Sequence, residues 1–101
     1  MSRREQLEKM LETEPDDVFL QYALAMQCAS DGDRTTALSR LQQVIDGSPD
    51  YVAAYFQRGQ LLDQEGETQA AREVLSRGIE VARQVGESHA EMEMTEFLGT
   101  L

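Results

Sequence analysis

The chain has 101 residues, of which 41% are hydrophobic and 28% are charged, as in an ordinary small globular domain. Its net charge is -10 and its isoelectric point is about 4.4, which argues against binding to DNA, RNA or an anionic membrane, because phosphate groups require a basic face. A basic or neutral protein partner fits this charge better. Because no apolar run approaches the length of a membrane span or resembles a signal peptide, the cytoplasm is the expected compartment.

Apolar periodicity and turn residues predict six helices along the chain. Their expected ranges are 3–14, 16–31, 34–46, 50–65, 68–84 and 88–98. Pro15 and Pro49 are expected at or near the first turns of the second and fourth helices, where a missing N–H costs least. Gly32 and Gly66 are expected to end the same two helices in a left-handed conformation.

The sequence repeats with a period of 34 residues, which is the distance from Pro15 to Pro49. The same offset pairs further small and apolar residues: Val18 with Val52, Ala25 with Gly59, Gly32 with Gly66, Ala37 with Ala71, Leu41 with Leu75, and Ile45 with Ile79. Such a period predicts stacked helix-turn-helix units. We therefore divide this single domain into a half-repeat helix (1–14), a first repeat (15–48), a second repeat (49–82) and a capping helix (83–101).

These residues resemble the tetratricopeptide repeat family, in the form of a small bacterial protein. The family unit is a 34-residue helix-turn-helix with fixed small positions and a closing proline. The residues that carry the resemblance are Ala25 and Gly59, Gly32 and Gly66, Ala37 and Ala71, Leu41 and Leu75, and Pro15 and Pro49. The resemblance implies an all-α fold, in which antiparallel helix-turn-helix repeats stack as a short right-handed solenoid of about six helices.

The chain departs from the family pattern at several positions. The usual aromatic residue is replaced by Gln21 in the first repeat and retained as Tyr55 in the second. Arg58 stands where the family usually has leucine, and Gly78 takes the position that Val44 has in the first repeat. We expect these departures to weaken the core locally without disturbing the spacing.

Gly59 lies inside the fourth predicted helix, where glycine costs about 1 kcal/mol relative to alanine. Its counterpart in the first repeat, Ala25, is also small. We expect both residues to lie where the two helices of a repeat cross most closely, against Ala37 and Ala71. A larger side chain would then push the helices apart.

The resemblance implies an inner groove lined by the first helix of each repeat, and one stripe of these helices is the candidate binding site. Its residues are Phe19, Tyr22, Met26, Phe56, Gln57, Gln60, Asp63, Glu91, Met94 and Phe97. Apolar anchors with a polar, acidic rim would suit a helix or an extended peptide of a partner protein. The alternatives are burial of these residues in the core, or a self-associating scaffold in which a homodimer hides Phe19 and Tyr22.

One activity of the family is not expected. Members that bind acidic C-terminal peptides of chaperones use Lys, Arg and Asn in the groove. The matching positions include Ala23, Met26, Gln57, Gln60 and Gln64, none of which is a cation. We therefore expect a partner other than an acidic C-terminal peptide.

The residue pattern predicts no enzyme, cofactor or metal site. His89 is the single histidine, and it matches neither the zinc deaminase nor the His-Glu-x-x-His pattern. Cys28 is the single cysteine and lies in an apolar run, so we expect a small buried hydrophobic side chain. The sequence therefore predicts a non-enzymatic protein-interaction module.

Overall fold

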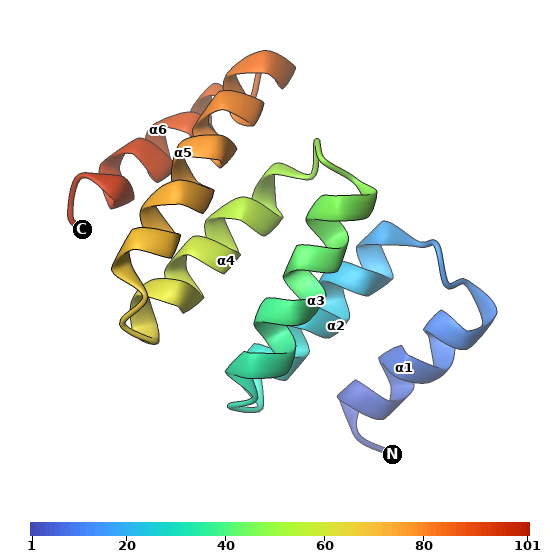
Figure 1. The fold of residues 1–101 in the computed structure, drawn as a ribbon. Helices are drawn as coiled ribbons and strands as arrows, with labels where there is room; N and C mark the ends of the chain where they lie inside the picture. Colours follow the sequence, from blue (N-terminus) through green and yellow to red (C-terminus); the bar gives the residue numbers. More distant parts are fainter.

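A computed structural model describes all residues from 1 to 101 and contains six α-helices, as predicted (Figure 1). The helices are α1 (Arg3–Thr13), α2 (Val18–Ser30), α3 (Arg34–Gly47), α4 (Val52–Gln64), α5 (Thr68–Val85) and α6 (Ser88–Leu98). Their ends differ from the predicted ends by two residues at most. Consecutive helices pack against one another, and the chain termini lie at opposite ends of the array.

The helices that follow the two prolines begin later than the sequence suggested. Pro15 and Pro49 lie in turns before α2 and α4 rather than in their first helical turns. Asp17 caps α2 instead, and its carboxylate accepts a hydrogen bond from the backbone N–H of Leu20 at 3.0 Å. The prolines therefore shape the entry into each repeat, while α2 begins at its aspartate cap.

Left-handed glycines end three helices. Gly32 and Gly66 have φ angles of 84° and 77°, as expected from the sequence, and Gly86 closes α5 with φ 80°. After each glycine, a backbone N–H donates to a carbonyl five residues back: Asp33 to Cys28, Glu67 to Leu62, and Glu87 to Ala82, all at 2.9 Å. Each of these bonds satisfies a carbonyl group that the helix end would otherwise leave unpaired.

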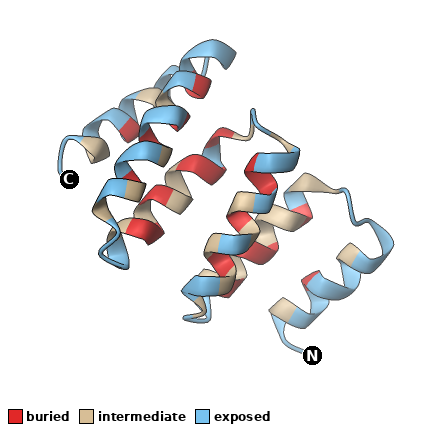
Figure 2. Ribbon diagram, viewed as in Figure 1, coloured by how far each residue is buried: buried red, intermediate tan, exposed pale blue.

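The core is a continuous cluster of 17 buried residues to which all six helices contribute. Figure 2 shows the buried positions where the helices face one another and the exposed positions on the outer sides. The array measures 40 × 29 × 19 Å, so it is elongated along the stacking direction. None of the helices combines the length and the apolar character that crossing a membrane requires.

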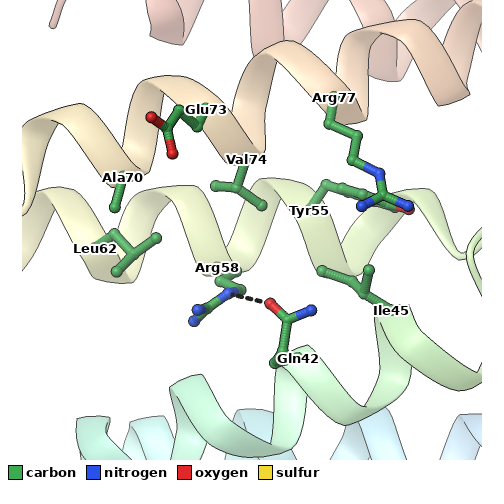
Figure 3. A pocket seen from close by; sticks show the side chains of 9 residues that line it. All are labelled: Gln42, Ile45, Tyr55, Arg58, Leu62, Ala70, Glu73, Val74 and Arg77. Atoms are coloured by element: carbon green, nitrogen blue, oxygen red, sulfur yellow. Dashed lines mark hydrogen bonds between the residues drawn. The ribbon is translucent and has the colours of Figure 1, made fainter.

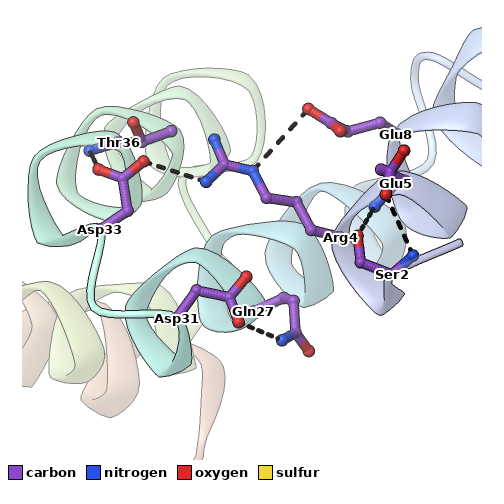
Figure 4. A network of polar contacts seen from close by, with 8 residues as sticks. All are labelled: Ser2, Arg4, Glu5, Glu8, Gln27, Asp31, Asp33 and Thr36. Carbon is purple, nitrogen blue, oxygen red and sulfur yellow. Dashed lines mark hydrogen bonds and ion pairs between the residues drawn. The ribbon is translucent and has the colours of Figure 1, made fainter.

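Polar contacts tie α1 to the turn between α2 and α3 (Figure 4). The Arg4 guanidinium donates to the Asp33 carboxylate at 3.0 Å, and Asp33 also accepts from the backbone N–H of Thr36 at 3.2 Å. At the start of α1, Ser2 and Glu5 form a reciprocal capping box. The half-repeat helix is thus capped at its first turn and joined to the first repeat through Asp33.

Gly59 lies at a close helix crossing, as the sequence predicted. A Cβ atom at this position would lie 2.6 Å from both Cγ and Cδ2 of Leu75 on α5. The nearest neighbour is therefore Leu75, one helical turn beyond the expected Ala71. Since Leu75 is fully buried, it has little room to move away.

Gly78 corrects an expectation. A Cβ atom there would lie 2.6 Å from Cβ of Tyr55 on α4 and 2.8 Å from Sδ of Met94 on α6. Tyr55 and Met94 are both completely buried. Gly78 therefore does not weaken the core but allows α4 and α6 to pack closely on α5.

Candidate peptide-binding surface

The α2 part of the candidate surface consists of Phe19, Tyr22 and Met26. Their spacing of three and four residues places them along one face of the helix. Phe19 is 65% exposed, which makes it the most exposed aromatic side chain, while Tyr22 and Met26 are half-buried. This face therefore has an accessible aromatic anchor beside two partly covered apolar side chains.

The α4 part consists of Phe56, Gln57, Gln60 and Asp63, all of which are half-buried. Gln57 lies near Tyr22 of α2: burial raises the pKa of the Tyr22 hydroxyl, and hydrogen bonding with Gln57 opposes that rise. The structure thus brings residues of α2 and α4 together on this surface.

Aromatic pairs connect the helices of the candidate surface. The rings of Phe56 on α4 and Phe97 on α6 meet edge to face, with their centroids 5.9 Å apart. The ring of Tyr22 on α2 lies 5.1 Å from that of Tyr51, the residue that immediately precedes α4. Such contacts hold the aromatic side chains in place, so part of the surface is organised before any partner binds.

Tyr51 was missed by the sequence analysis. The expected stripe contains only helical positions at regular spacing, and Tyr51 is the N-cap residue of α4 rather than a member of the helix. Periodicity therefore cannot find it. Its contact with Tyr22 depends on how α2 packs beside α4.

Met94 does not belong to the accessible surface, contrary to the sequence prediction. It is completely buried, and its Sδ atom lies against Gly78. Glu91 and Phe97 are half-buried, and the Glu91 carboxylate accepts a hydrogen bond from Nε of Arg83 on α5 at 3.0 Å. On α6 the accessible candidates are therefore Phe97 and Glu91, the second of which is already paired.

Met94 is buried because the capping helix α6 is rotated about its axis relative to the predicted register. The inward positions Ala90 and Met94 of α6 follow the inward positions Tyr55 and Gly59 of α4 by 35 residues instead of 34. A shift of one residue turns the presented face of a helix by about 100°. It arises because α5 continues to Val85 and Gly86 replaces the proline turn that follows α3.

The candidate surface is open rather than enclosed. Five surface pockets, with volumes from about 170 to 500 Å³, are lined by other residues. None of the candidate residues is basic, and Asp63 and Glu91 are acidic. This geometry suits a protein segment better than a small molecule, which needs a concave site.

The remaining reactive side chains are accounted for by their surroundings. His89 is a surface residue whose side chain is 80% exposed, and its Nε2 lies 3.4 Å from Oε1 of Glu93. Cys28 is completely buried, as expected, and burial raises the pKa of its thiol. No cluster of three or more His, Cys, Asp or Glu residues is arranged to hold a metal ion.

Comparison with known proteins decides the family. Residues 29–91, more than half of the chain, match a family model described as "Tetratricopeptide repeat", and residues 2–51 match a second model with the same description. The chain belongs to the tetratricopeptide repeat family. Domains of this family are in general protein–protein interaction modules and are typically non-catalytic.

Several bacterial proteins are similar to this tetratricopeptide repeat chain. The TPR repeat-containing protein PA0015 of Pseudomonas aeruginosa is 33% identical over 97 residues, which cover 96% of this chain and 92% of that protein. The solution structure of a tetratricopeptide repeat domain protein from Salinibacter ruber has a TM-score of 0.82 at 30% identity, covering 85% of this chain and 87% of that one. Protein BPP2914 from Bordetella parapertussis has a TM-score of 0.87 at 27% identity, covering 99% and 87%.

Proposed function

We propose that this chain binds a helix or an extended segment of a partner protein across the surface formed by α2, α4 and the end of α6. The observation that carries the proposal is the exposed Phe19, which lies on the same face as Tyr22 and Met26. Covering a side chain of this size contributes about 1.5–3 kcal/mol. A partner would therefore gain substantial free energy by docking an apolar side chain there.

The chemistry of the surface indicates the kind of segment. Phe19, Tyr22, Met26 and Phe56 supply aromatic and flexible apolar contacts, and Asp63 supplies negative charge. A helical partner would present apolar residues at i, i+3, i+4 and i+7 with neutral or basic residues between them. An acidic C-terminal peptide is disfavoured, since the surface has no cation and the protein carries a charge of -10.

The test is quantitative affinity capture with the intact chain and with the double variant Phe19→Ala/Tyr22→Ala. Direct partners should be recovered at least about tenfold less efficiently by the double variant, because two central aromatic contacts are lost. Met92→Ala is the matched control: Met92 is 50% exposed and lies outside the candidate surface. Equal recovery of every partner by the double variant would show that the site is wrong.

A second measurement guards against misfolding of the double variant. Phe19→Ser changes only the exposed side chain, so its melting temperature should match that of the unmodified chain. It should also lose partner recovery, although less than the double variant. Normal recovery by Phe19→Ser, with loss only in a destabilised double variant, would count against direct binding at Phe19.

A second candidate function is self-association as a scaffold, with the same face buried between two copies. The exposure of Phe19 favours this reading as well, because exposed aromatic patches mark interfaces of either kind. Light scattering and sedimentation at tens of micromolar distinguish the two functions. A monomer at these concentrations would exclude the homodimer, whereas a dimer that Phe19→Ser dissociates would support it.

A further inference from the structure

Two clefts lie on a different side of α4 from the candidate peptide-binding surface. The first has a volume of about 290 Å³ and lies between α3, α4 and α5 (Figure 3). The second has a volume of about 470 Å³ and lies between α3 and α4. Both are lined by Gln42, Arg58 and Leu62, so the clefts meet at these residues and form one open trough.

The trough is spatially separate from the surface that contains Phe19. With 3.6 residues per turn, Tyr55, Arg58 and Leu62 project from the side of α4 roughly opposite to Phe56 and Gln60. A ligand in the trough would therefore leave the Phe19 surface free. An inference about the trough does not depend on the proposed function.

Arg58 is the central polar residue of the trough. Its Nε donates to Oε1 of Gln42 at 2.9 Å (Figure 3), and Nη1 donates to the carbonyl oxygen of Leu38 at 3.3 Å. A guanidinium group has five N–H donors, so several remain free. The side chain is half-buried, no carboxylate lies within 4.0 Å of it, and the loss of solvation lowers its pKa, which the charge of Asp46 partly opposes.

The N–H donors of Arg58 that have no protein partner would stabilise an anion bound in the trough. A partly buried cation is costly without a partner, and a charge-assisted hydrogen bond to a carboxylate would offset that cost. Arg77 supplies a second positive charge, with its guanidinium 5.9 Å from the centre of the Tyr55 ring. Glu73 also lines the cleft and the charge of Asp46 acts on Arg58, so a carboxylate would have to bind Arg58 through direct hydrogen bonds rather than through a general excess of positive charge.

The first repeat shows that this cation is not needed for the fold. Leu24 occupies the position equivalent to Arg58 and is 1% exposed. Leucine at this position is therefore well packed in the first repeat. Arg58 replaces a packing residue with a charged group that lines two clefts, which favours a role in binding.

We propose that the trough binds an acidic side chain of a partner protein, with its carboxylate on Arg58 and an adjacent apolar side chain against Leu62 and Val74. The apolar part of the lining supplies the contact for the second side chain. A polypeptide segment fits better than a small anion, because the two clefts are open and continuous along α3 and α4. The partner segment would thus combine Asp or Glu with a neighbouring aliphatic residue.

The test uses a capped tetrapeptide, Asp-Leu-Asp-Leu, and its uncharged match, Asn-Leu-Asn-Leu, in an NMR titration of the isotope-labelled chain. The acidic peptide should shift the Nε–Hε signal of Arg58 and the backbone amides of Leu62 and Val74. It should bind at least about tenfold more tightly than the uncharged peptide, as expected for a charge-assisted hydrogen bond. Equal binding of the two peptides, or no shift of these signals, would overturn the proposal.

Two variants test whether binding of the acidic peptide depends on Arg58. Arg58→Leu restores the residue of the equivalent position, so it should fold, and it should weaken binding of the acidic peptide at least about tenfold. Arg72→Leu removes the same charge from an exposed position on α5 outside both clefts, and it should leave binding unchanged. An equal loss in both variants would indicate a general effect of net charge and would overturn the proposal.

Inorganic phosphate distinguishes a protein segment from a free anion. At the same concentration as the peptide, phosphate should shift the Arg58 signal less and should leave the amides of Leu62 and Val74 unchanged, since it has no apolar group. If phosphate reproduces the full pattern of shifts, the trough is a site for free anions and the proposed partner is wrong.

Discussion

The two complete repeats fill equivalent positions in opposite ways. In the second repeat, Tyr55 is completely buried and lies against Gly78 of the paired helix. At the equivalent positions of the first repeat, Gln21 is half-buried and Val44 is completely buried. In the second repeat, the first helix has a large side chain and the second helix has glycine. In the first repeat, the second helix has valine instead. The two helices of a repeat therefore share one packing volume.

A polar contact is retained despite this exchange. The Tyr55 hydroxyl donates to the carbonyl oxygen of Pro49 at 2.6 Å, and Nε2 of Gln21 donates to the carbonyl oxygen of Pro15 at 2.7 Å. Both bonds tie a first helix to the turn that precedes it. The glutamine therefore preserves the hydrogen bond of the tyrosine without its bulk.

The largest effect is expected where the second repeat is given the residue of the first. Gly78→Val places a Cβ atom 2.6 Å from Cβ of Tyr55, which is held by the backbone of α4, and should destabilise the fold by about 3 kcal/mol. Urea denaturation gives the free energy of unfolding. Combining Gly78→Val with Tyr55→Gln recreates the first-repeat pair, so the double variant should cost less than the sum of the single variants. If the two single-variant changes in the free energy of unfolding simply added in the double variant, the two residues would not share one packing volume.

The next effect concerns the small position that both repeats share. Gly59→Leu should cost more than about 2 kcal/mol, because its side chain would enter the space of the buried Leu75. Ala53→Leu is a matched control on an exposed position of the same helix and should change stability by less than about 0.5 kcal/mol. If Gly59→Leu did not lower the free energy of unfolding in the same urea assay, the proposed repeat register would be wrong.

A smaller difference is expected from the two equivalent hydrogen bonds. Tyr55→Phe should cost about 1 kcal/mol, because the carbonyl oxygen of Pro49 loses its partner while the ring remains buried. Gln21→Met should cost less, since water can reach the carbonyl oxygen of Pro15 at that exposed bond. Thermal denaturation of both variants measures the difference. An equal cost would mean that burial does not distinguish the two bonds.

The smallest effect compares the residues that precede the second helices. Asp33 caps α3 through the N–H of Thr36, whereas Glu67 makes no such bond before α5. At neutral pH, Asp33→Ala should therefore lower the melting temperature more than Glu67→Ala. Thermal melts at several pH values measure both changes.

The same pair predicts a pH dependence. Hydrogen bonds from Thr36, with a further contribution from Arg4, lower the pKa of the Asp33 carboxyl below its ordinary value of 3.8. A lowered pKa means that the stabilisation is present above 3.8 and is lost as the pH falls through the lower value. The difference between Asp33→Ala and Glu67→Ala should therefore disappear in strong acid. A difference that persists there would assign the effect to something other than the ionised carboxylate.

Most of the fold was predictable because its signals are local. Gly32 and Gly66 end helices in a left-handed conformation that depends only on nearby backbone, and the structure places both there. Gly59 was predictable as a close contact because the 34-residue period aligns it with Ala25. Of the candidate surface, the helical spacing together with the family resemblance selected Phe19 and Tyr22, and the structure leaves the first exposed and the second half-buried.

The rest depended on distances between helices. Met94 was expected on the accessible surface. The longer α5 and the Gly86 turn shift the register of α6 by one residue, and this shift turns Met94 into the core. Tyr51 could not be selected, because its contact with Tyr22 joins two helices through a residue outside either stripe. A sequence period carries no information about such rotations.

By itself, the sequence determined the helices, most of their ends, the repeat period and the acidic character of the protein, since each follows from residues close in the chain or from composition. Only the tertiary structure decided that Gly78 makes room for Tyr55 and Met94 and that Arg58 lies where two clefts meet. These features depend on how three successive helices share volume. Packing of that kind is set by distances of a few ångströms between segments that are far apart in the sequence.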